Sequence, residues 1–224
     1  MELQVDNIQP EKYPSKRLEF SVSSRAEPPE IAVDASKTDW VNYFLCGYKG
    51  IVEELKIQRP VHMRVMVDGT VPQGSGLSSS SALVCAAALA TLQANGREMK
   101  KEELAVVTAR FEKFVGIDSG GMDQAISFLA EQGKAKRIYF KPIRAESVVL
   151  PDGIAWFVQH TLVDSLKQRT GATNYNKRVV ECRLASVLLA QTLKIAAEKA
   201  LTLSALQHAA NLSLDDLLTL VEKT

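Results

Sequence analysis

An almost wholly apolar stretch at residues 82–92 constrains the fold of this chain more than any other feature. It follows a loop rich in glycine and serine, and Asn95-Gly96 ends it in the manner of a helix C-terminus. A helix that is apolar all round is buried on most of its sides. We therefore expect residues 82–92 to form a helix inside a core that other elements surround.

The neighbouring segments supply both helices and strands for such a core. Apolar residues recur at helical spacing between residues 41 and 55, after a possible N-cap at residues 37–39, and residues 63–67 alternate as in a strand. Further helices are expected at 101–114, 123–132 and 176–197. Two shorter helices are expected after them, with capping signals at Ser204 and Ser213. Strands are expected at 18–22, 135–141 and 154–163. The remainder of the first thirty residues looks weakly packed. Helices and strands mixed without regular βαβ alternation favour an α+β fold.

Charge and cysteine content limit the kinds of partner. The 27 basic and 26 acidic residues nearly cancel, so no broad field favours nucleic acid or an anionic membrane. Cys46, Cys85 and Cys182 are odd in number and widely spaced, which fits thiols in a reducing compartment. The first residues contain no basic or apolar leader, and no segment approaches the roughly 20 apolar residues of a membrane span. We expect a cytoplasmic protein that binds a small molecule or another protein.

The loop before the apolar helix has the composition of an anion site. Gly74 and Gly76 allow tight turns and close approach to a ligand, and the helix start offers unpaired N–H groups with a partial positive charge. Four consecutive serines, residues 78–81, add hydroxyls that can donate to phosphate oxygens or bind Mg2+. A serine-rich N-cap is the alternative. Four serines exceed what one cap requires, so the loop favours a polyphosphate.

Two common nucleotide motifs do not match this loop. A P-loop needs GxxxxGK followed by serine or threonine, and no lysine follows these glycines. A dinucleotide fingerprint needs a third glycine where Ser79 stands. The sequence therefore supports neither a Walker-type ATPase nor a dehydrogenase.

Residues 72–82 resemble the PxxxGLSSSA phosphate loop of the GHMP kinases, a family that includes galactokinase, homoserine kinase, mevalonate kinase and phosphomevalonate kinase. Three other segments resemble the galactokinase and N-acetylgalactosamine kinase branch: WVNYF at 40–44, GGMDQAIS at 120–127 and TNYNKRVVECR at 173–183. The segments occur in family order, and the resemblance runs from about residue 35 to residue 190.

The resemblance implies a GHMP kinase fold in two parts. Residues 1–150 would form the N-terminal, ATP-binding domain, of the ribosomal protein S5 domain 2-like type, and residues 151–224 would begin the C-terminal domain. It also implies phosphoryl transfer from ATP, with Mg2+, to the anomeric C1 hydroxyl of galactose or N-acetylgalactosamine, in galactose metabolism.

Individual residues take roles from the same resemblance. Asp123 would be the catalytic carboxylate, which accepts or polarises the C1 hydroxyl proton, although by itself it could simply start a helix. Glu112 and Ser80 fit the Mg2+ ligands of the family; without the resemblance, Glu112 is a charge on an amphipathic helix. Trp40 would lie against the adenine or in the core. The implied ATP contacts are Trp40, Pro72, Gly74, Ser75, Gly76, Leu77, Ser78, Ser79 and Ser80, and the implied sugar contacts are Ser119, Gly120 and Tyr175.

Two motifs of the family have no counterpart in these 224 residues. One is a segment of the type GRVNLIGEHIDY, which supplies sugar contacts and an arginine beside the catalytic aspartate, and the other is a GAGxGG segment beside the phosphates. These groups orient the sugar and neutralise charge, so we expect a chain truncated at both ends with weak or no turnover by itself. A regulatory sensor that binds galactose and ATP, or a remnant without function, remains an alternative.

Overall fold

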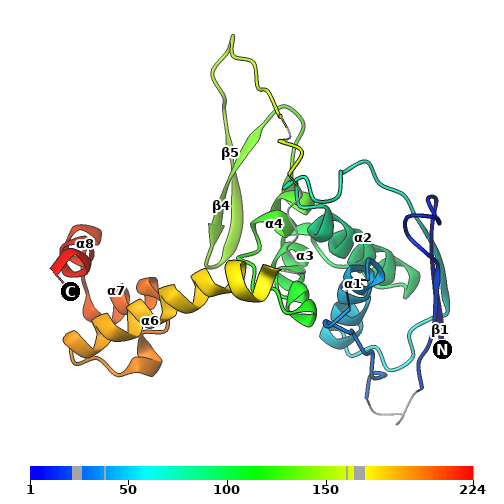
Figure 1. The fold of residues 1–224 in the computed structure, drawn as a ribbon, viewed down its shortest axis with the longest axis horizontal. Coiled ribbons are helices and arrows are strands. Elements are labelled where there is room, and N and C mark those ends of the chain that lie inside the picture. Colours follow the sequence, from blue (N-terminus) through cyan, green and yellow to red (C-terminus); the bar gives the residue numbers. More distant parts are fainter. Residues whose placement is uncertain (22–26, 38, 160, 164–169, 224) are drawn as a thin grey trace. The chain divides into compact units, whose positions relative to one another are not determined.

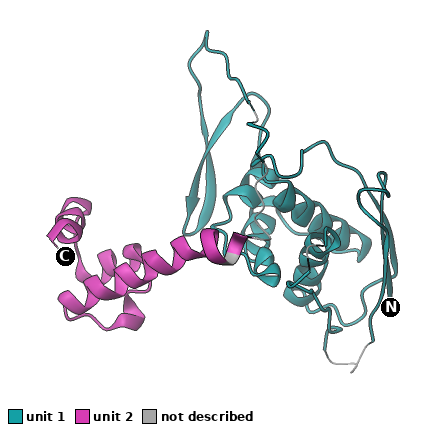
Figure 2. Ribbon diagram, in the orientation of Figure 1, with its two compact units in different colours: residues 1–169 teal, residues 170–224 magenta. Residues whose placement is uncertain are grey.

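The computed structural model describes residues 1–21, 27–37, 39–159, 161–163 and 170–223. The chain forms two compact units, Met1–Arg169 and Thr170–Thr224 (Figure 2). Helices and strands are mixed within the first unit, which confirms the predicted α+β class (Figure 1). The assignment of residues 1–150 and 151–224 to two domains of the GHMP kinases stays a prediction.

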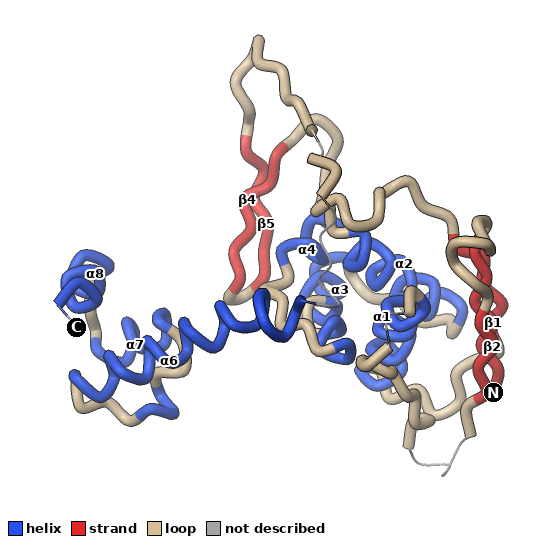
Figure 3. The backbone as a smooth tube through the Cα atoms, in the orientation of Figure 1, coloured by secondary structure: helices blue, strands red, loops and turns tan. Residues whose placement is uncertain are grey.

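A three-stranded sheet in the first unit has the order β2-β1-β3. Figure 3 shows β1 and β2 in red near the N-terminus. Its strands are β1 (Glu2–Asn7), β2 (Lys16–Glu19) and β3 (Met63–Val67). The central strand pairs antiparallel with β2, where Leu3 lies opposite Leu18, and parallel with β3, where Val5 lies opposite Val65. Leu3 and Val5 are fully buried. The prediction that the first thirty residues are weakly packed, apart from a strand at 18–22, is therefore wrong for β1. This strand was missed because its two apolar side chains are too few to show an alternating pattern. Of the strand predicted at 18–22, residues 18 and 19 belong to β2, residues 20 and 21 are not in a strand, and residue 22 lies outside the described residues.

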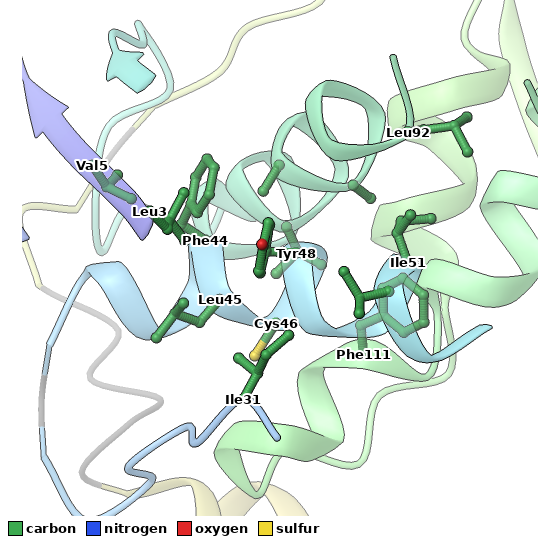
Figure 4. Packing of buried hydrophobic residues seen from close by; sticks show 14 of the residues in the cluster. Leu3, Val5, Ile31, Phe44, Leu45, Cys46, Tyr48, Ile51, Leu92 and Phe111 are labelled. Carbon is green, nitrogen blue, oxygen red and sulfur yellow. The ribbon is translucent and has the colours of Figure 1, made fainter. Parts of the chain in front are cut away.

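Two long helices, α1 (Val41–Glu54) and α2 (Ser79–Ala94), form the centre of the core. Figure 4 shows Leu3 and Val5 of the sheet lying toward Phe44 of α1, and Phe111 beside Ile51 farther along that helix. The expected apolar helix is confirmed, although its face at Leu89 is exposed. The N-cap was predicted at residues 37–39, of which Thr38 lies outside the described residues, but Trp40 occupies the N-cap position of α1. Asp39, one residue earlier, accepts the Val41 N–H at 3.0 Å.

The two helices touch at Gly47. A Cβ atom at this position would lie 2.3 Å from the Val84 carbonyl oxygen and 2.7 Å from the Ala88 nitrogen, both backbone atoms of α2. Glycine is therefore what permits the backbones of α1 and α2 to approach so closely.

The helix predicted over residues 101–114 is interrupted. It forms α3 (Lys101–Thr108) and a separate 3-10 turn, η1 (Phe111–Val115). The Thr108 hydroxyl donates to the Leu104 carbonyl at 2.5 Å, a bond between a side chain and the preceding turn that often bends helices. As a consequence Glu112 points inward and is only 3% exposed, so the alternative of a solvated charge on an amphipathic helix does not hold.

After η1 comes α4 (Met122–Leu129), followed by a hairpin of β4 (Ala135–Phe140) and β5 (Ile143–Val148). The first strand of this hairpin was expected, whereas the second was not, because its charged residues Arg144 and Glu146 weaken the apolar pattern. The strand predicted at 154–163 is wrong for the residues described there, since no neighbouring strand pairs with them; residue 160 lies outside the described part. Trp156 and Phe157 remain largely exposed.

The second unit is helical. A π-helical turn (Gly171–Tyr175) leads into α6 (Asn176–Thr192), which starts where predicted but ends five residues earlier than 197, and then come a 3-10 turn (Ala197–Lys199), α7 (Leu203–Ala210) and α8 (Leu214–Lys223). Thr202, not the predicted Ser204, caps α7 by accepting the Ala205 N–H. Ser213 caps α8 as predicted by accepting the Asp216 N–H at 3.1 Å. Among the helices of the described ranges, none is both long and apolar enough to cross a membrane.

Candidate functional site

The glycine and serine loop connects β3 to α2 and is held in a turn by its own groups. Gly74 and Gly76 have φ angles of 74° and 76°, a region that residues with side chains rarely adopt. The Ser75 hydroxyl donates to the Pro72 carbonyl at 2.7 Å and accepts the Leu77 N–H at 3.3 Å. These two hydrogen bonds lie within the loop itself.

The helix that follows the loop begins without a side-chain cap. Ser78 occupies the N-cap position in a left-handed conformation, with φ 61° and ψ 42°, and its hydroxyl makes no capping bond. The alternative of a serine N-cap is thus not realised at this residue. The first backbone N–H groups of a helix have no intrahelical partner, so those of Ser79 and Ser80 are available to an anion.

A buried group of polar side chains, which we call the carboxylate cluster, joins three elements of the first unit: Ser81 of α2, Glu112 of η1 and Gln124 of α4. The Ser81 hydroxyl donates to Glu112 Oε1 at 3.1 Å. Gln124 Nε2 donates to Glu112 Oε2 at 3.2 Å and to Ser81 Oγ at 3.4 Å. Ser81 and Gln124 are fully buried. The predicted ligand Ser80 precedes Ser81 in the same helical turn, so the hydroxyl in contact with Glu112 belongs to its neighbour.

The carboxylate cluster fits a divalent cation such as Mg2+. The two hydrogen-bond donors that the described residues give to Glu112 are neutral, and a buried carboxylate without a positive partner is costly. Gln124 Oε1 is buried and has no hydrogen-bond partner in the described part of the chain. The described residues contain no group of three or more His, Cys, Asp or Glu that could hold a metal. This donor set suits Mg2+, which takes one or two protein ligands and completes its shell with water and phosphate oxygens.

Asp123 immediately precedes Gln124 in the first turn of α4 and is half-buried. Burial raises the pKa of the Cys85 thiol in α2 to about 12, and the negative charges of Glu112 and Asp123 contribute to the increase in this pKa. Electrostatic interactions of this kind weaken with distance. Both carboxylates therefore lie within electrostatic range of Cys85 in α2.

The glycine turn before α4 is packed tightly. Gly121 has a φ of 90°, and a Cβ atom there would lie 2.5 Å from the Ala109 Cβ, so only glycine fits. The Ser119 hydroxyl is buried without a hydrogen-bond partner among the described residues. Gly120 lies beside the Phe140 ring, because a Cβ atom built on Gly120 would be 3.6 Å from that ring. The turn thus offers an unsatisfied hydroxyl four residues before Asp123.

Trp40 is connected to the glycine and serine loop by a residue that the sequence did not indicate, Tyr13. The two rings meet edge to face with their centroids 5.8 Å apart, and the Trp40 indole N–H donates to the Pro14 carbonyl at 3.1 Å. The Tyr13 hydroxyl donates to Gln73 Oε1 of the loop at 2.9 Å. Tyr13 lies in a segment without a motif, so no sequence signal pointed to this connection.

The first unit thus brings together the start of α2, Glu112 and the start of α4, and links Trp40 to the loop through Tyr13. Tyr175 belongs to the second unit, where it ends the π-helical turn and is 39% exposed. The roles predicted for Asp123, Ser80, Glu112, the loop residues and Tyr175 stay predictions.

The thiols permit a first test of this geometry. Burial raises the pKa values of Cys46 and Cys85 to about 12, with Glu112 adding to both, whereas Cys182 is exposed. Only the thiolate is nucleophilic, and a raised pKa keeps a thiol protonated at pH 8. We expect native protein at that pH to react rapidly with a thiol reagent such as Ellman's reagent at Cys182 only. Guanidinium chloride should expose the other two, and rapid modification of Cys85 in the native state would contradict the packing described above.

Comparisons with known proteins point to one family. Residues 42–131 match the family described as GHMP kinases N terminal domain. The chain is 44% identical to a galactokinase of Dictyostelium discoideum over 215 residues. This alignment covers 95% of the chain and 42% of that protein. It is 40% identical over 178 residues to a galactokinase of Saccharomyces cerevisiae, covering 72% of this chain and 34% of that protein. The chain therefore spans less than half the length of these relatives.

Two solved structures share the fold. Lactococcus lactis galactokinase complexed with galactose aligns over 85% of this chain and 46% of that chain, with a TM-score of 0.59 and 18% identity. Methanococcus jannaschii mevalonate kinase aligns over 99% of this chain and 66% of that chain, with a TM-score of 0.53 and 15% identity.

Proposed function

Because residues 42–131 match the N-terminal domain of the GHMP kinases and the chain is 44% identical to a galactokinase over 215 residues, we propose that it acts as a galactokinase-type sugar kinase, in which a phosphoryl group passes from ATP to the C1 hydroxyl of galactose. The observation that carries the proposal is the carboxylate cluster. It ties Glu112 to the first turn of α2, which follows the phosphate loop, and to the first turn of α4, which bears Asp123.

In the proposed site the loop and the helix start bind the triphosphate. The N–H groups at the start of α2 donate to phosphate oxygens, and Gly74 and Gly76 allow the backbone to approach them. Trp40, held by Tyr13, lies against the adenine. The proposed ATP contacts are those predicted from the sequence: Trp40, Pro72, Gly74, Ser75, Gly76, Leu77, Ser78, Ser79 and Ser80.

Glu112 and Ser80 would hold Mg2+ in this site. When bound, the ion neutralises negative charge on the phosphates, which is much of what a phosphoryl-transfer site must supply. Within the described residues, Glu112 has no positively charged partner and Gln124 Oε1 has no hydrogen-bond partner, and both observations support this assignment.

Asp123 is proposed to act on the sugar. A positioned carboxylate can accept the proton of the attacking hydroxyl as a general base. The proposed sugar contacts are Ser119, whose hydroxyl has no hydrogen-bond partner among the described residues, Gly120 and Tyr175. Galactose is favoured over N-acetylgalactosamine because the relatives above are named galactokinases. A cytoplasmic location fits the three free cysteines.

Calorimetry and a coupled kinase assay on the 224-residue chain test the proposal. We expect Mg-ATP to bind, and turnover with galactose to fall far below the roughly 1–100 s−1 of typical kinases, because two motifs that orient the sugar and neutralise charge have no counterpart here. Any residual turnover by this chain should disappear in Asp123→Asn. Activity from a contaminating kinase would not change, so the variant distinguishes the two sources. Absence of Mg-ATP binding would overturn the nucleotide site, and turnover at ordinary kinase rates would overturn the expectation of weak activity.

A further inference from the structure

We propose that Gln124 is a positioning residue that sets the Mg2+ affinity of Glu112 and links it to the helix bearing Asp123. This inference rests on the proposed function, because it assumes that Glu112 binds the magnesium ion of Mg-ATP. It concerns a residue to which neither the loop motif nor the acid–base chemistry assigns a role.

The hydrogen bonds of Gln124 are suited to orienting the Glu112 carboxylate. A glutamine amide has two N–H donors and one carbonyl acceptor. Gln124 Nε2 donates to Glu112 Oε2 at 3.2 Å and to Ser81 Oγ at 3.4 Å. The Ser81 hydroxyl donates to the other carboxylate oxygen of Glu112 at 3.1 Å. The three side chains form a closed ring in which each carboxylate oxygen is held from a different helix. The orientation of Glu112 therefore depends on Gln124 and Ser81 together.

Burial makes the arrangement rigid. Gln124 and Ser81 are fully buried and Glu112 is 3% exposed, so competition from bulk solvent for these hydrogen bonds is weak. Successive residues of a helix point about 100° apart, which lets Gln124 face the core while Asp123, its neighbour, is half-buried. Gln124 thereby connects Glu112 to the helical turn that carries Asp123.

The unpartnered oxygen indicates which ligand completes the cluster. Gln124 Oε1 is buried and accepts no hydrogen bond from the described residues, and a buried acceptor left in this state is destabilising. A metal-bound water is an O–H donor, and Mg2+ usually keeps several waters. Gln124 would then act on the ion twice, by orienting the carboxylate ligand and by accepting from a coordinated water. Hydrogen-bond partners of metal ligands commonly influence metal affinity in this way.

The test compares Gln124→Met with the unaltered chain by calorimetry of ADP binding over a range of free Mg2+ concentrations. Methionine keeps the length of the side chain but removes the donors and the acceptor. We expect the Mg2+ concentration for half-maximal strengthening of ADP binding to rise about 10–100-fold, the usual effect of losing such a partner. The affinity for ADP in EDTA should not change. Gln132→Met, at an exposed amide that the site does not use, is the matched control.

The outcomes separate this inference from the proposed function. If the unaltered chain does not bind ADP with or without Mg2+, the proposed function falls and the inference falls with it. If the unaltered chain shows a magnesium dependence and Gln124→Met shows the same one, the inference alone is overturned. A merely structural glutamine would lower the melting temperature without changing that dependence.

Gln124→Glu keeps the test decisive if Gln124→Met does not fold. It retains the shape of the side chain but places a second carboxylate beside Glu112, and a divalent cation relieves the repulsion between the two. We expect Mg2+ with ADP to raise the melting temperature of this variant more than that of the unaltered chain. An equal or smaller increase would mean that this side chain does not face the ion, and would overturn the inference.

Discussion

Glu112→Gln is expected to abolish the magnesium dependence of ATP binding while making the chain itself more stable. The substitution removes the negative charge that would hold the cation but preserves the shape of the side chain. The effect on Mg2+ affinity should exceed the roughly 10–100-fold expected from losing a hydrogen-bond partner of a ligand, because a ligand itself is altered. ATP affinity measured by calorimetry should then be the same in Mg2+ and in EDTA.

The stability gain follows from the environment of Glu112. The carboxylate is 3% exposed, and among the described residues it accepts hydrogen bonds from the neutral groups of Ser81 and Gln124 alone. A neutral amide avoids burying a charge, and the Gln124 amide can turn so that its oxygen accepts from the new N–H. We expect an increase on the order of 1 kcal/mol in the free energy of unfolding without Mg2+, or about 2–4 °C in melting temperature. The control is Glu102→Gln at an exposed carboxylate of α3. Retention of full magnesium dependence in Glu112→Gln would refute the assigned role.

Gly47→Ala is expected to cause a large loss of stability by adding a single methyl group. The new Cβ would lie 2.3 Å from the Val84 carbonyl oxygen, 2.7 Å from the Ala88 nitrogen and 2.8 Å from the Ala87 Cβ. Two of these are backbone atoms of α2, so no rotamer change relieves the contact, and α1 and α2 must separate. The better helix propensity of alanine, about 1 kcal/mol, offsets only part of this cost.

We expect a net loss of about 3 kcal/mol, which corresponds to a melting temperature roughly 6–12 °C lower for a chain of this size. Urea titration and thermal unfolding measure it. Gly69→Ala is the matched control, because no atom lies within 4 Å of its Cβ position and its φ is not in the left-handed region, so its stability should be nearly unchanged. Equal stability of Gly47→Ala and the unaltered chain would show that the two helices are not in close contact.

The sequence predicted the helical core better than the sheet. Periodicity located α1, and the apolar run located α2, because both helices bury long apolar faces that leave a strong pattern. The central strand β1 was missed, since Leu3 and Val5 are its only fully buried side chains and its remaining residues are polar. Its place in the core is set by pairing with β2 and β3. Pairing between segments that are distant in the sequence cannot be predicted from the residues of one short segment.

The candidate site shows the same division between local and tertiary information. The serine run, Glu112 and Asp123 were singled out because motifs are local. The contact between Glu112 and Ser81 depends instead on the break between α3 and η1, which turns the glutamate inward, and no motif records that break. Tyr13 and Gln124 were not identified because their contribution is a contact with residues far away in the sequence.

The position of Glu112 also bears on how the chain withstands oxidants. Peroxides attack the thiolate form of cysteine, and the carboxylate lies near enough to both core sulfurs, Cys46 and Cys85, to disfavour that form in addition to the effect of burial. A group suited to holding a cation therefore also protects the interior from sulfenic acid formation. Oxidative damage should accumulate first at Cys182, on the surface of the second unit, where a lesion leaves the packing of α1 against α2 intact.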